Sequence, residues 1–194
     1  MTTGRPDSPS SDKSEFRKAA AQRRREIVPV TGEAFIPSFA AIPLAPSSVV
    51  AGYWPLGDEA DVRPLLAELS ARGHVIVLPA VLQKNAPLVF RRWFVGQELE
   101  RGPHRTVHPP ASAEVVEPDL LLVPLLAFDD RGGRLGYGGV FYDRTLAALR
   151  GAVKKILAVG VAYGAQRWPA LPMDEHDQRL DWVITEQGAL EMCS

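Results

Sequence analysis

A glycine-rich segment from Asp129 to Asp143 holds residue types that are well suited to binding an anion. It reads DDRGGRLGYGGVFYD and contains five of the chain's 16 glycines, together with Arg131 and Arg134. Glycine lets the backbone approach a ligand closely and adopt positive φ, so several N–H groups can point at one anion. A segment that is only a turn seldom carries these charges as well. The pattern predicts a phosphate-binding loop.

The segment differs from two well-known nucleotide loops. The sequence contains no GxxxxGK[ST], which excludes a P-loop NTPase. The dinucleotide motif GxGxxG also fails, because Phe141 stands where its third glycine would be. The residues after the glycines, FYDRTLAALRGAV, predict a helix. Its N-terminus would bring unpaired N–H groups and a partial positive charge to the predicted phosphate site.

The rest of the chain alternates predicted strands with predicted helices. Strands are expected over residues 49–54, 75–79, 87–94, 119–124, 155–163 and 181–188, and helices over 13–27, 33–42, 62–72 and 142–153. Most of these strands are continuously apolar, which is typical of a parallel sheet buried on both faces. The order therefore predicts a three-layer α/β sandwich with a mostly parallel sheet. Ligands of such sheets bind beyond the carboxyl ends of the strands, where the glycine-rich segment begins.

Length and composition predict one globular domain over residues 13–194, preceded by a disordered tail over residues 1–12. The 194 residues are 46% hydrophobic and 23% charged, with a net charge of −1. This balance argues against a nucleic-acid or membrane partner. The single cysteine, Cys193, permits no intrachain disulfide and fits a reducing cytoplasm. The long apolar run that starts at Leu120 is interrupted by Pro124 and is too short to span a bilayer.

VPLLAFDDRGGRLGYGGVFYDRTLA closely resembles the signature of the 5-formyltetrahydrofolate cyclo-ligase (methenyltetrahydrofolate synthetase) family. Further blocks of the chain match in the same order, namely KSEFR, YWPLGDEADVR, LPAV and LPMDEHDQRLDWVITE. The resemblance implies a Rossmann-like sandwich and an enzyme that uses ATP and Mg²⁺ to cyclise 5-formyltetrahydrofolate to 5,10-methenyltetrahydrofolate, releasing ADP and phosphate. In this family the formyl oxygen attacks the γ-phosphate, so the protein must orient its substrates and neutralise charge.

The resemblance also assigns roles to individual residues. It implies that Arg134 and Tyr142 are catalytic, that Trp54 and Glu59 contact the folate, and that Asp143 and Asp177 bind Mg²⁺. The expected ATP contacts are Lys13, Arg17, Arg134, Leu135, Gly136, Tyr137, Gly138, Gly139, Val140, Phe141 and Tyr142. A small-molecule reduced folate is thus the expected partner, and the protein is expected to be a monomer or a weak homodimer.

Local sequence by itself also allows interpretations in which these segments have no binding role. KSEFR fits a solvated basic helix, Glu59 fits a helix-entry carboxylate, and MDEHDQRLD fits a solvated acidic loop. Val140 and Leu125 stand where the family usually has glycine, and a β-branched residue at positive φ is costly. Leu125 is expected to narrow the floor of the pocket. Two further functions therefore stay open: a binding protein without turnover, and an ATP-dependent ligase or kinase for another small molecule.

Overall fold

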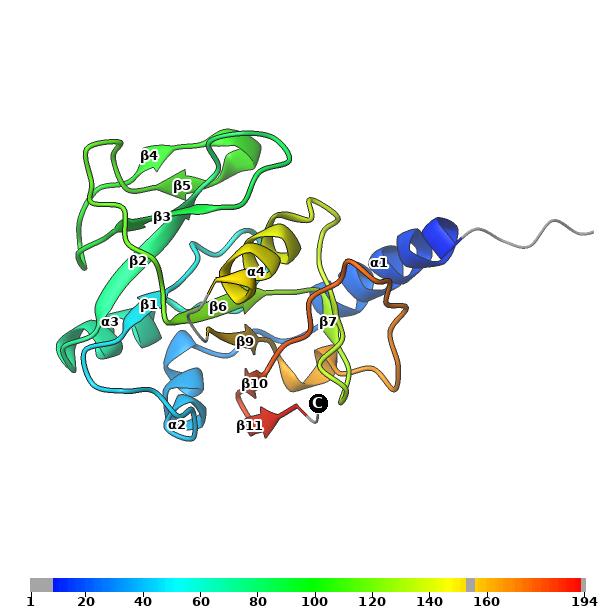
Figure 1. Cartoon of the computed structure of the whole chain (residues 1–194). Helices are drawn as coiled ribbons and strands as arrows, with labels where there is room; N and C mark the ends of the chain where they lie inside the picture. Colours follow the sequence, from blue (N-terminus) through cyan, green and yellow to red (C-terminus); the bar gives the residue numbers. More distant parts are fainter. Residues whose placement is uncertain (1–8, 153–155, 193–194) are drawn as a thin grey trace, which may run out of the picture.

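The computed structural model describes residues 9–152 and 156–192, which form one α/β sandwich (Figure 1). A seven-stranded sheet lies at its centre, in the order β11-β10-β9-β6-β1-β2-β3. The strands in that order are Gly188–Glu191, Trp182–Thr185, Leu157–Val161, Leu120–Pro124, Val49–Ala51, Val75–Ala80 and Val89–Arg92. The five inner strands are parallel, whereas β3 and β11 pair antiparallel at the two edges. The predicted three-layer sandwich with a mostly parallel sheet is confirmed.

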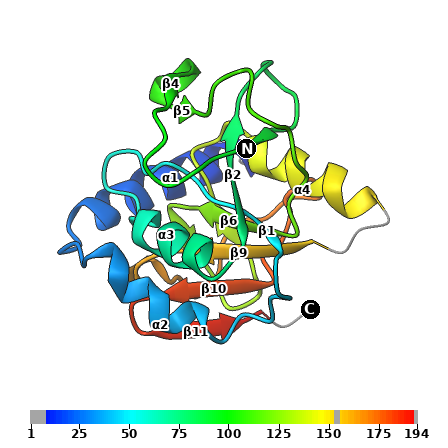
Figure 2. The ribbon, with the colours of Figure 1, turned by 90° about the vertical axis from the view of Figure 1, so that its left-hand side faces the viewer.

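Helices cover both faces of the sheet (Figure 2). The helices α2 (Ile36–Phe39) and α3 (Arg63–Ala71) and the 3-10 helix η1 (Gly32–Phe35) pack on one face, and α4 (Phe141–Gly151) packs on the other. Alternate residues of β6 serve the two layers: Leu120 and Leu122 face α3, whereas Leu121 and Val123 face α4. Because both faces are covered, β6 has to be apolar throughout its length.

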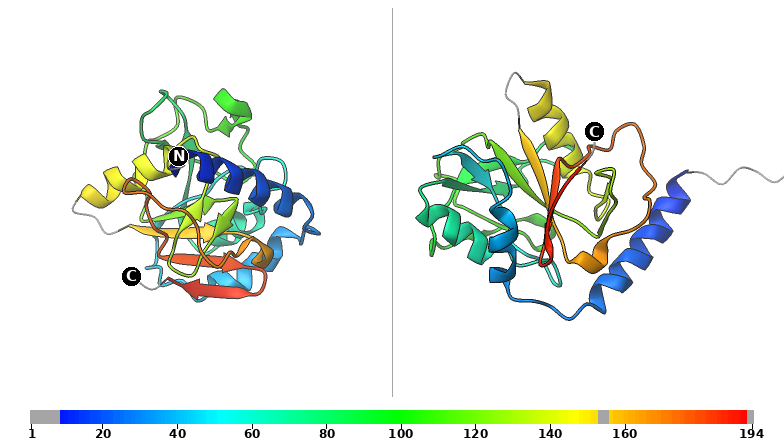
Figure 3. Two further views of the ribbon diagram at one scale, coloured as in Figure 1. Left: turned by 90° about the vertical axis from the view of Figure 1, so that its right-hand side faces the viewer. Right: turned by 90° about the horizontal axis from the view of Figure 1, so that it is seen from below.

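The N-terminal helix α1 (Pro9–Arg25) crosses the end of the sheet rather than either face (Figure 3). Its Phe16 and Ala20 pack on a short hairpin formed by β7 (Ala127–Phe128) and β8 (Arg134–Leu135), which directly follows the carboxyl end of β6. This packing places α1 over the carboxyl end of the sheet, where ligands of such sheets bind. None of the helices in residues 9–152 and 156–192 is long and apolar enough to cross a membrane.

Several boundaries differ from the sequence-based expectation, among them the start of the first helix and the extent of the last strand. The first helix begins at Pro9, four residues before the predicted start, because proline is tolerated at the first helical position and Ser and Asp suit the first turn. Residues 9–12 are therefore helical, while the remainder of the predicted tail and Cys193 lie outside the described residues. The last predicted strand is a hairpin of β10 and β11, joined by a turn that ends at Gly188 with φ of 148°.

Residues 96–118 form an excursion between β3 and β6 that contains β4 (Glu100–Arg101), β5 (Val107–His108) and the 3-10 helix η2 (Pro103–Arg105). The strands β4 and β5 pair with each other, separately from the central sheet. The excursion returns toward the sheet where the His104 ring lies 6.2 Å from the ring of Phe141, at the start of α4. It therefore reaches over the beginning of the helix that follows the glycine-rich segment.

Candidate active site

The glycine-rich segment divides into a structural turn and an open loop. In the turn, the buried carboxylate of Asp129 accepts hydrogen bonds from the backbone N–H groups of Arg131 (3.0 Å), Gly133 (2.9 Å) and Leu171 (3.0 Å). A Cβ atom at Gly132 would lie 2.6 Å from the carbonyl oxygen of Leu180, so this glycine is required for packing. The first half of the segment is thus a turn, and the predicted phosphate loop is limited to residues 136–140.

The open loop leads directly into α4. Gly138 has φ of 94°, and Val140, at the N-cap of α4, has φ of 55°. The expectation of a strained backbone at Val140 therefore holds. Within the described residues, no backbone N–H from Gly138 to Val140 has a hydrogen-bond partner. Together with the helix N-terminus these groups form a ready site for an anion.

From one face of α1, Arg17 reaches this loop and Lys13 reaches the 174–178 loop. Arg17 donates from Nε to the carbonyl oxygen of Gly136 at 3.2 Å, and its guanidinium carbon lies 3.5 Å from where a Cβ atom of Gly138 would be. Lys13 forms ion pairs with Asp174 at 2.7 Å and with Asp177. Burial lowers the pKa of Lys13, but its hydrogen bonds to Asp174 and Asp177 outweigh that effect and raise the pKa. The ammonium group therefore stays charged beside Asp174 and Asp177.

Arg134 and Asp143 form a second ion pair at the same place. Both terminal nitrogens of the Arg134 guanidinium donate to Oδ1 of Asp143, at 2.7 and 3.2 Å, and the side chain of Arg134 is only 5% exposed. Burial lowers the pKa of Arg134, which Asp143 and Asp177 oppose. The backbone N–H of Gln178 donates to the same Asp143 oxygen at 2.9 Å, which joins α4 to the 174–178 loop. We call Lys13, Arg134, Asp143, Asp174 and Asp177 the ion-pair cluster.

The two expected magnesium ligands both lie in this cluster. Asp143 uses Oδ1 and Asp177 uses Oδ2 for protein contacts, and in the described part of the chain the other oxygen of each carboxylate accepts no hydrogen bond. Residues 9–152 and 156–192 contain no group of three or more His, Cys, Asp or Glu side chains placed to hold a metal. Two carboxylates with free oxygens fit a cation that takes its remaining ligands from phosphate and water, as Mg²⁺ does.

Three of the predicted ATP contacts are partly or fully buried, namely Leu135, Phe141 and Tyr142. Leu135 is buried in the apolar cluster under α1, and its carbonyl oxygen accepts from the N–H of Leu126 at 2.7 Å. Phe141 and Tyr142 are half-buried in the first turn of α4. Burial raises the pKa of the Tyr142 hydroxyl far above its ordinary value of 10.0, so that the phenol remains neutral. Leu135 therefore contributes packing in this structure, rather than an exposed contact.

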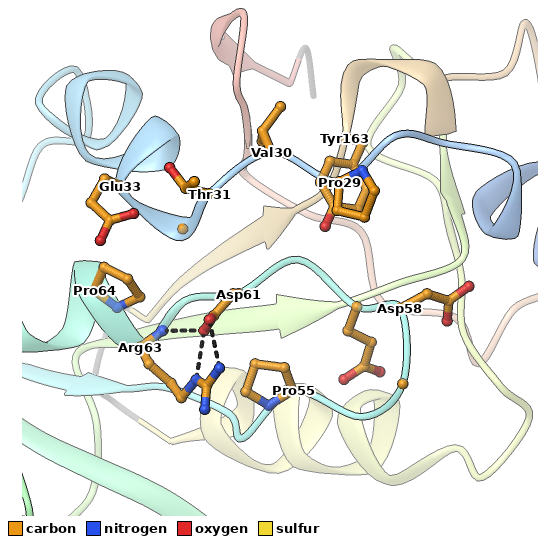
Figure 4. A pocket seen from close by; sticks show the side chains of 13 residues that line it. Pro29, Val30, Thr31, Glu33, Pro55, Asp58, Asp61, Arg63, Pro64 and Tyr163 are labelled. Carbon is orange, nitrogen blue, oxygen red and sulfur yellow. Dashed lines mark hydrogen bonds and ion pairs between the residues drawn. The ribbon is translucent and has the colours of Figure 1, made fainter.

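Glu59, one of the two residues expected to contact the folate, lines a cavity of about 510 Å³ (Figure 4). The cavity is lined by residues from the 29–33 segment, from the 55–64 loop after β1, and by Tyr163. Glu59 is 8% exposed, and burial raises its pKa although the N–H of Leu56 donates to its Oε2 at 2.8 Å. Figure 4 shows Asp61 bound to Arg63 on the same wall.

Trp54 stands beside this cavity rather than in its lining. Its ring meets that of Trp93 edge to face at 5.8 Å, and the Arg63 guanidinium lies 5.4 Å from its centroid. The side chain of Leu125 is fully buried in the core beneath α4, and a Cβ atom at Gly160 would lie 2.9 Å from it. The expectation that Leu125 narrows the floor of the pocket is therefore wrong, because the side chain points into the sheet packing.

Sequence reasoning missed Arg24, which connects α1 to both sides of the site. Its guanidinium is buried, and it donates to the carbonyl oxygen of Leu125 at 3.2 Å, to Asp58 and to the hydroxyl of Tyr137. A signal existed, since Arg24 follows Phe16 and Ala20 at intervals of four and so shares their inward face. Arg24 stands in a run of three arginines at residues 23–25, and the run itself does not indicate that Arg24 is buried while its two neighbours are exposed.

Comparison with known proteins identifies relatives over most of the chain. Residues 9–186 match the 5-formyltetrahydrofolate cyclo-ligase family. The chain is 33% identical to the 5-formyltetrahydrofolate cyclo-ligase of Escherichia coli (strain K12) over 154 residues, covering 77% of this chain and 84% of that protein. It is 31% identical to that of Mycolicibacterium smegmatis over 189 residues, or 92% and 95% of the two chains.

Solved structures show the same relationship. The NMR structure of Aquifex aeolicus 5,10-methenyltetrahydrofolate synthetase superposes with a TM-score of 0.77 and 30% identity, over 94% of this chain and 93% of that one. The Mycoplasma pneumoniae synthetase, at 23% identity and a TM-score of 0.70, shares the fold over 90% and 99% of the two chains. The sequence blocks, the sheet and the match over residues 9–186 lead to one conclusion: the chain belongs to the 5-formyltetrahydrofolate cyclo-ligase family.

Proposed function

We propose that the protein catalyses the ATP- and Mg²⁺-dependent cyclisation of 5-formyltetrahydrofolate to 5,10-methenyltetrahydrofolate, with release of ADP and phosphate. The observation that carries the proposal is a group of three cations at the open loop and the start of α4. Arg17 contacts Gly136 of the open loop, whereas Lys13 and Arg134 contact two carboxylates that each keep a free oxygen, Asp177 and Asp143. A polyphosphate with a divalent cation has the charge that this arrangement complements.

The nucleotide would lie along the loop at residues 136–140. The free N–H groups and the N-terminus of α4 would hold its phosphates, with Lys13 and Arg17 above them and Arg134 at the reacting end. Asp143 and Asp177 would hold Mg²⁺, which neutralises phosphate charge when it is bound. Tyr142 stays neutral at all physiological pH values, so it would act as a hydrogen-bond donor near the phosphates.

The folate would bind in the cavity beside Glu59. A buried carboxylate can accept two N–H bonds from a heterocycle in a bidentate manner, and burial strengthens those bonds. Trp54 and Trp93 supply an aromatic wall next to the cavity. We propose that the folate lies between this wall and the open loop, with its reacting nitrogens toward the phosphates. The cytoplasmic location and the monomeric or weakly dimeric state remain predictions.

The test is the formation of 5,10-methenyltetrahydrofolate from 5-formyltetrahydrofolate, followed by absorbance with and without ATP and Mg²⁺. An increase that needs both additions is the expected result. Product without ATP, or no product from folded protein that binds ATP and folate, would overturn the proposal.

A binding protein without turnover is the second candidate, and the conformation of Val140 favours it. Val140 occupies the left-handed region at the N-cap of α4, and its side chain is 40% exposed. A β-branched side chain there stiffens the loop that has to adjust around phosphate. Binding of both ligands without product would support this candidate.

A further inference from the structure

Arg24 links three segments that are far apart in the sequence. Its guanidinium donates through Nη1 to the carbonyl oxygen of Leu125, at the carboxyl end of β6, and through Nη2 to Asp58 in the loop after β1. The same Nη2 also donates to the hydroxyl of Tyr137 in the open loop. With 4% of its surface exposed, Arg24 lies beneath the site and has no direct access to bulk solvent.

Tyr137 lies on the open loop, directly after the residue that Arg17 contacts. The Arg24 guanidinium carbon lies 5.3 Å from the centroid of the Tyr137 ring, so both the ring and the hydroxyl contact Arg24. Tyr137 is 55% exposed, which leaves much of the side chain accessible to a ligand. Two arginines of α1 therefore hold two consecutive loop residues, one by its carbonyl oxygen and one by its side chain.

The other end of the contact lies at the cavity. Asp58 and Glu59 are both part of its lining, and Asp58 shares one Arg24 nitrogen with Tyr137. Burial and the nearby carboxylate of Glu59 raise the pKa of Tyr137 to about 12, whereas Arg24 opposes this. The hydroxyl therefore keeps its proton at neutral pH and can donate toward the cavity while it accepts from Arg24. Movement of the open loop must then alter the position of Arg24 relative to the 55–59 loop.

We propose that Arg24 and Tyr137 are positioning residues that couple nucleotide binding at the open loop to folate binding beside Glu59. This inference rests on the function proposed above and adds that the two sites communicate. A nucleotide that fixes residues 136–140 also fixes the Tyr137 hydroxyl and, through Arg24, the 55–59 loop. The second ligand then meets a loop that is already ordered, so it binds more tightly, and the coupling is reciprocal.

The test compares folate affinity with and without nucleotide in wild type and in Tyr137→Phe. The probes are 5-formyltetrahydrofolate and a non-hydrolysable ATP analogue with Mg²⁺, measured by isothermal titration calorimetry. Phenylalanine keeps the ring against Arg24 and removes only the hydroxyl. In wild type the analogue should lower the folate Kd by at least about fivefold, as is typical of coupled sites. In Tyr137→Phe the ratio of the two Kd values should fall to near one.

Arg72→Gln is the control, because Arg72 is an exposed arginine at the C-cap of α3 whose one ion pair within the described residues is with Glu68 of that helix, at 2.8 Å. Its Kd ratio should equal that of wild type. A wild-type ratio near one, or a ratio that survives in Tyr137→Phe, would overturn the coupling while leaving the proposed function intact. Failure of the wild-type protein to bind 5-formyltetrahydrofolate at all would instead overturn both.

Discussion

The carboxylates of the ion-pair cluster and the carboxylate of Glu59 at the cavity differ in how their negative charge is compensated. In the cluster each carboxylate already contacts a cation, as Asp143 contacts Arg134 and Asp177 contacts Lys13. At the cavity, burial raises the pKa of Glu59, so its charge is costly before a ligand arrives. A ligand at the cluster would therefore replace existing ion pairs, whereas a ligand at the cavity would supply hydrogen-bond donors to the buried carboxylate of Glu59.

The largest expected effect tests the metal assignment on the cluster side. Asp143→Asn keeps one oxygen for Arg134 but replaces the free oxygen by an amide and removes the charge. Loss of a preorganised electrostatic group should lower kcat by about 10²- to 10³-fold. Steady-state rates at saturating ATP and Mg²⁺ measure this change.

Asp130→Asn is the control, because it makes the same substitution in the same glycine-rich segment, where the carboxylate is exposed and pairs with Arg167. It should keep wild-type activity. Full activity in a folded Asp143→Asn protein would remove the metal role from this carboxylate.

Lys13→Met tests whether the cluster binds the nucleotide. Methionine keeps much of the length of the side chain but loses a charge-assisted contact, so the KM for ATP should rise by roughly 10-fold or more, with a smaller change in the KM for folate. Lys18→Met, on an exposed position of the same helix, should leave both constants unchanged. Equal effects of the two substitutions would indicate a general loss of positive charge instead.

Glu59→Gln tests the cavity side, where the expected change is about fivefold in the KM for 5-formyltetrahydrofolate. In wild type this constant should also rise as the pH falls from neutrality toward the raised pKa of Glu59, which lies above the ordinary 4.5. The reason is that protonation removes one acceptor. The glutamine variant should lose this dependence. Glu33→Gln, an exposed carboxylate on the same cavity, should keep the wild-type profile.

The smallest effect concerns the loop between the two sites. Val140→Gly removes a β-branched side chain from φ of 55° and should stabilise the protein by about 0.5–1 kcal/mol, because the cost of the left-handed region exceeds the entropy cost of glycine. Urea unfolding at an unchanged slope measures the shift. Val28→Gly, whose φ is not positive, should not stabilise. A loss of stability in Val140→Gly would show that the valine side chain itself contributes packing.

The sequence predicted features that depend on local patterns, but it did not predict contacts between distant segments or the final hairpin. The continuous apolar runs were enough for the parallel sheet, and local spacing placed Lys13 and Arg17 on one face of α1. Asp129 closes its turn through the nearby N–H groups of Arg131 and Gly133, but no local pattern could show its contact with the N–H of Leu171, which lies 42 residues further along the chain. The hairpin of β10 and β11 was missed, because the EQG turn signal stands inside an apparent single strand.

The position of α1 has a consequence for the order in which the protein is assembled during synthesis. Its contacts join residues that are far apart in the chain: Arg24 and Leu125 differ by 101 positions, Arg17 and Gly136 by 119, and Lys13 and Asp177 by 164. A helix with such distant partners cannot dock until the later residues have left the ribosome. Helix α1 is therefore synthesised before its partners but is among the last elements to dock, and a nascent chain that stops before Asp177 has an incomplete ion-pair cluster.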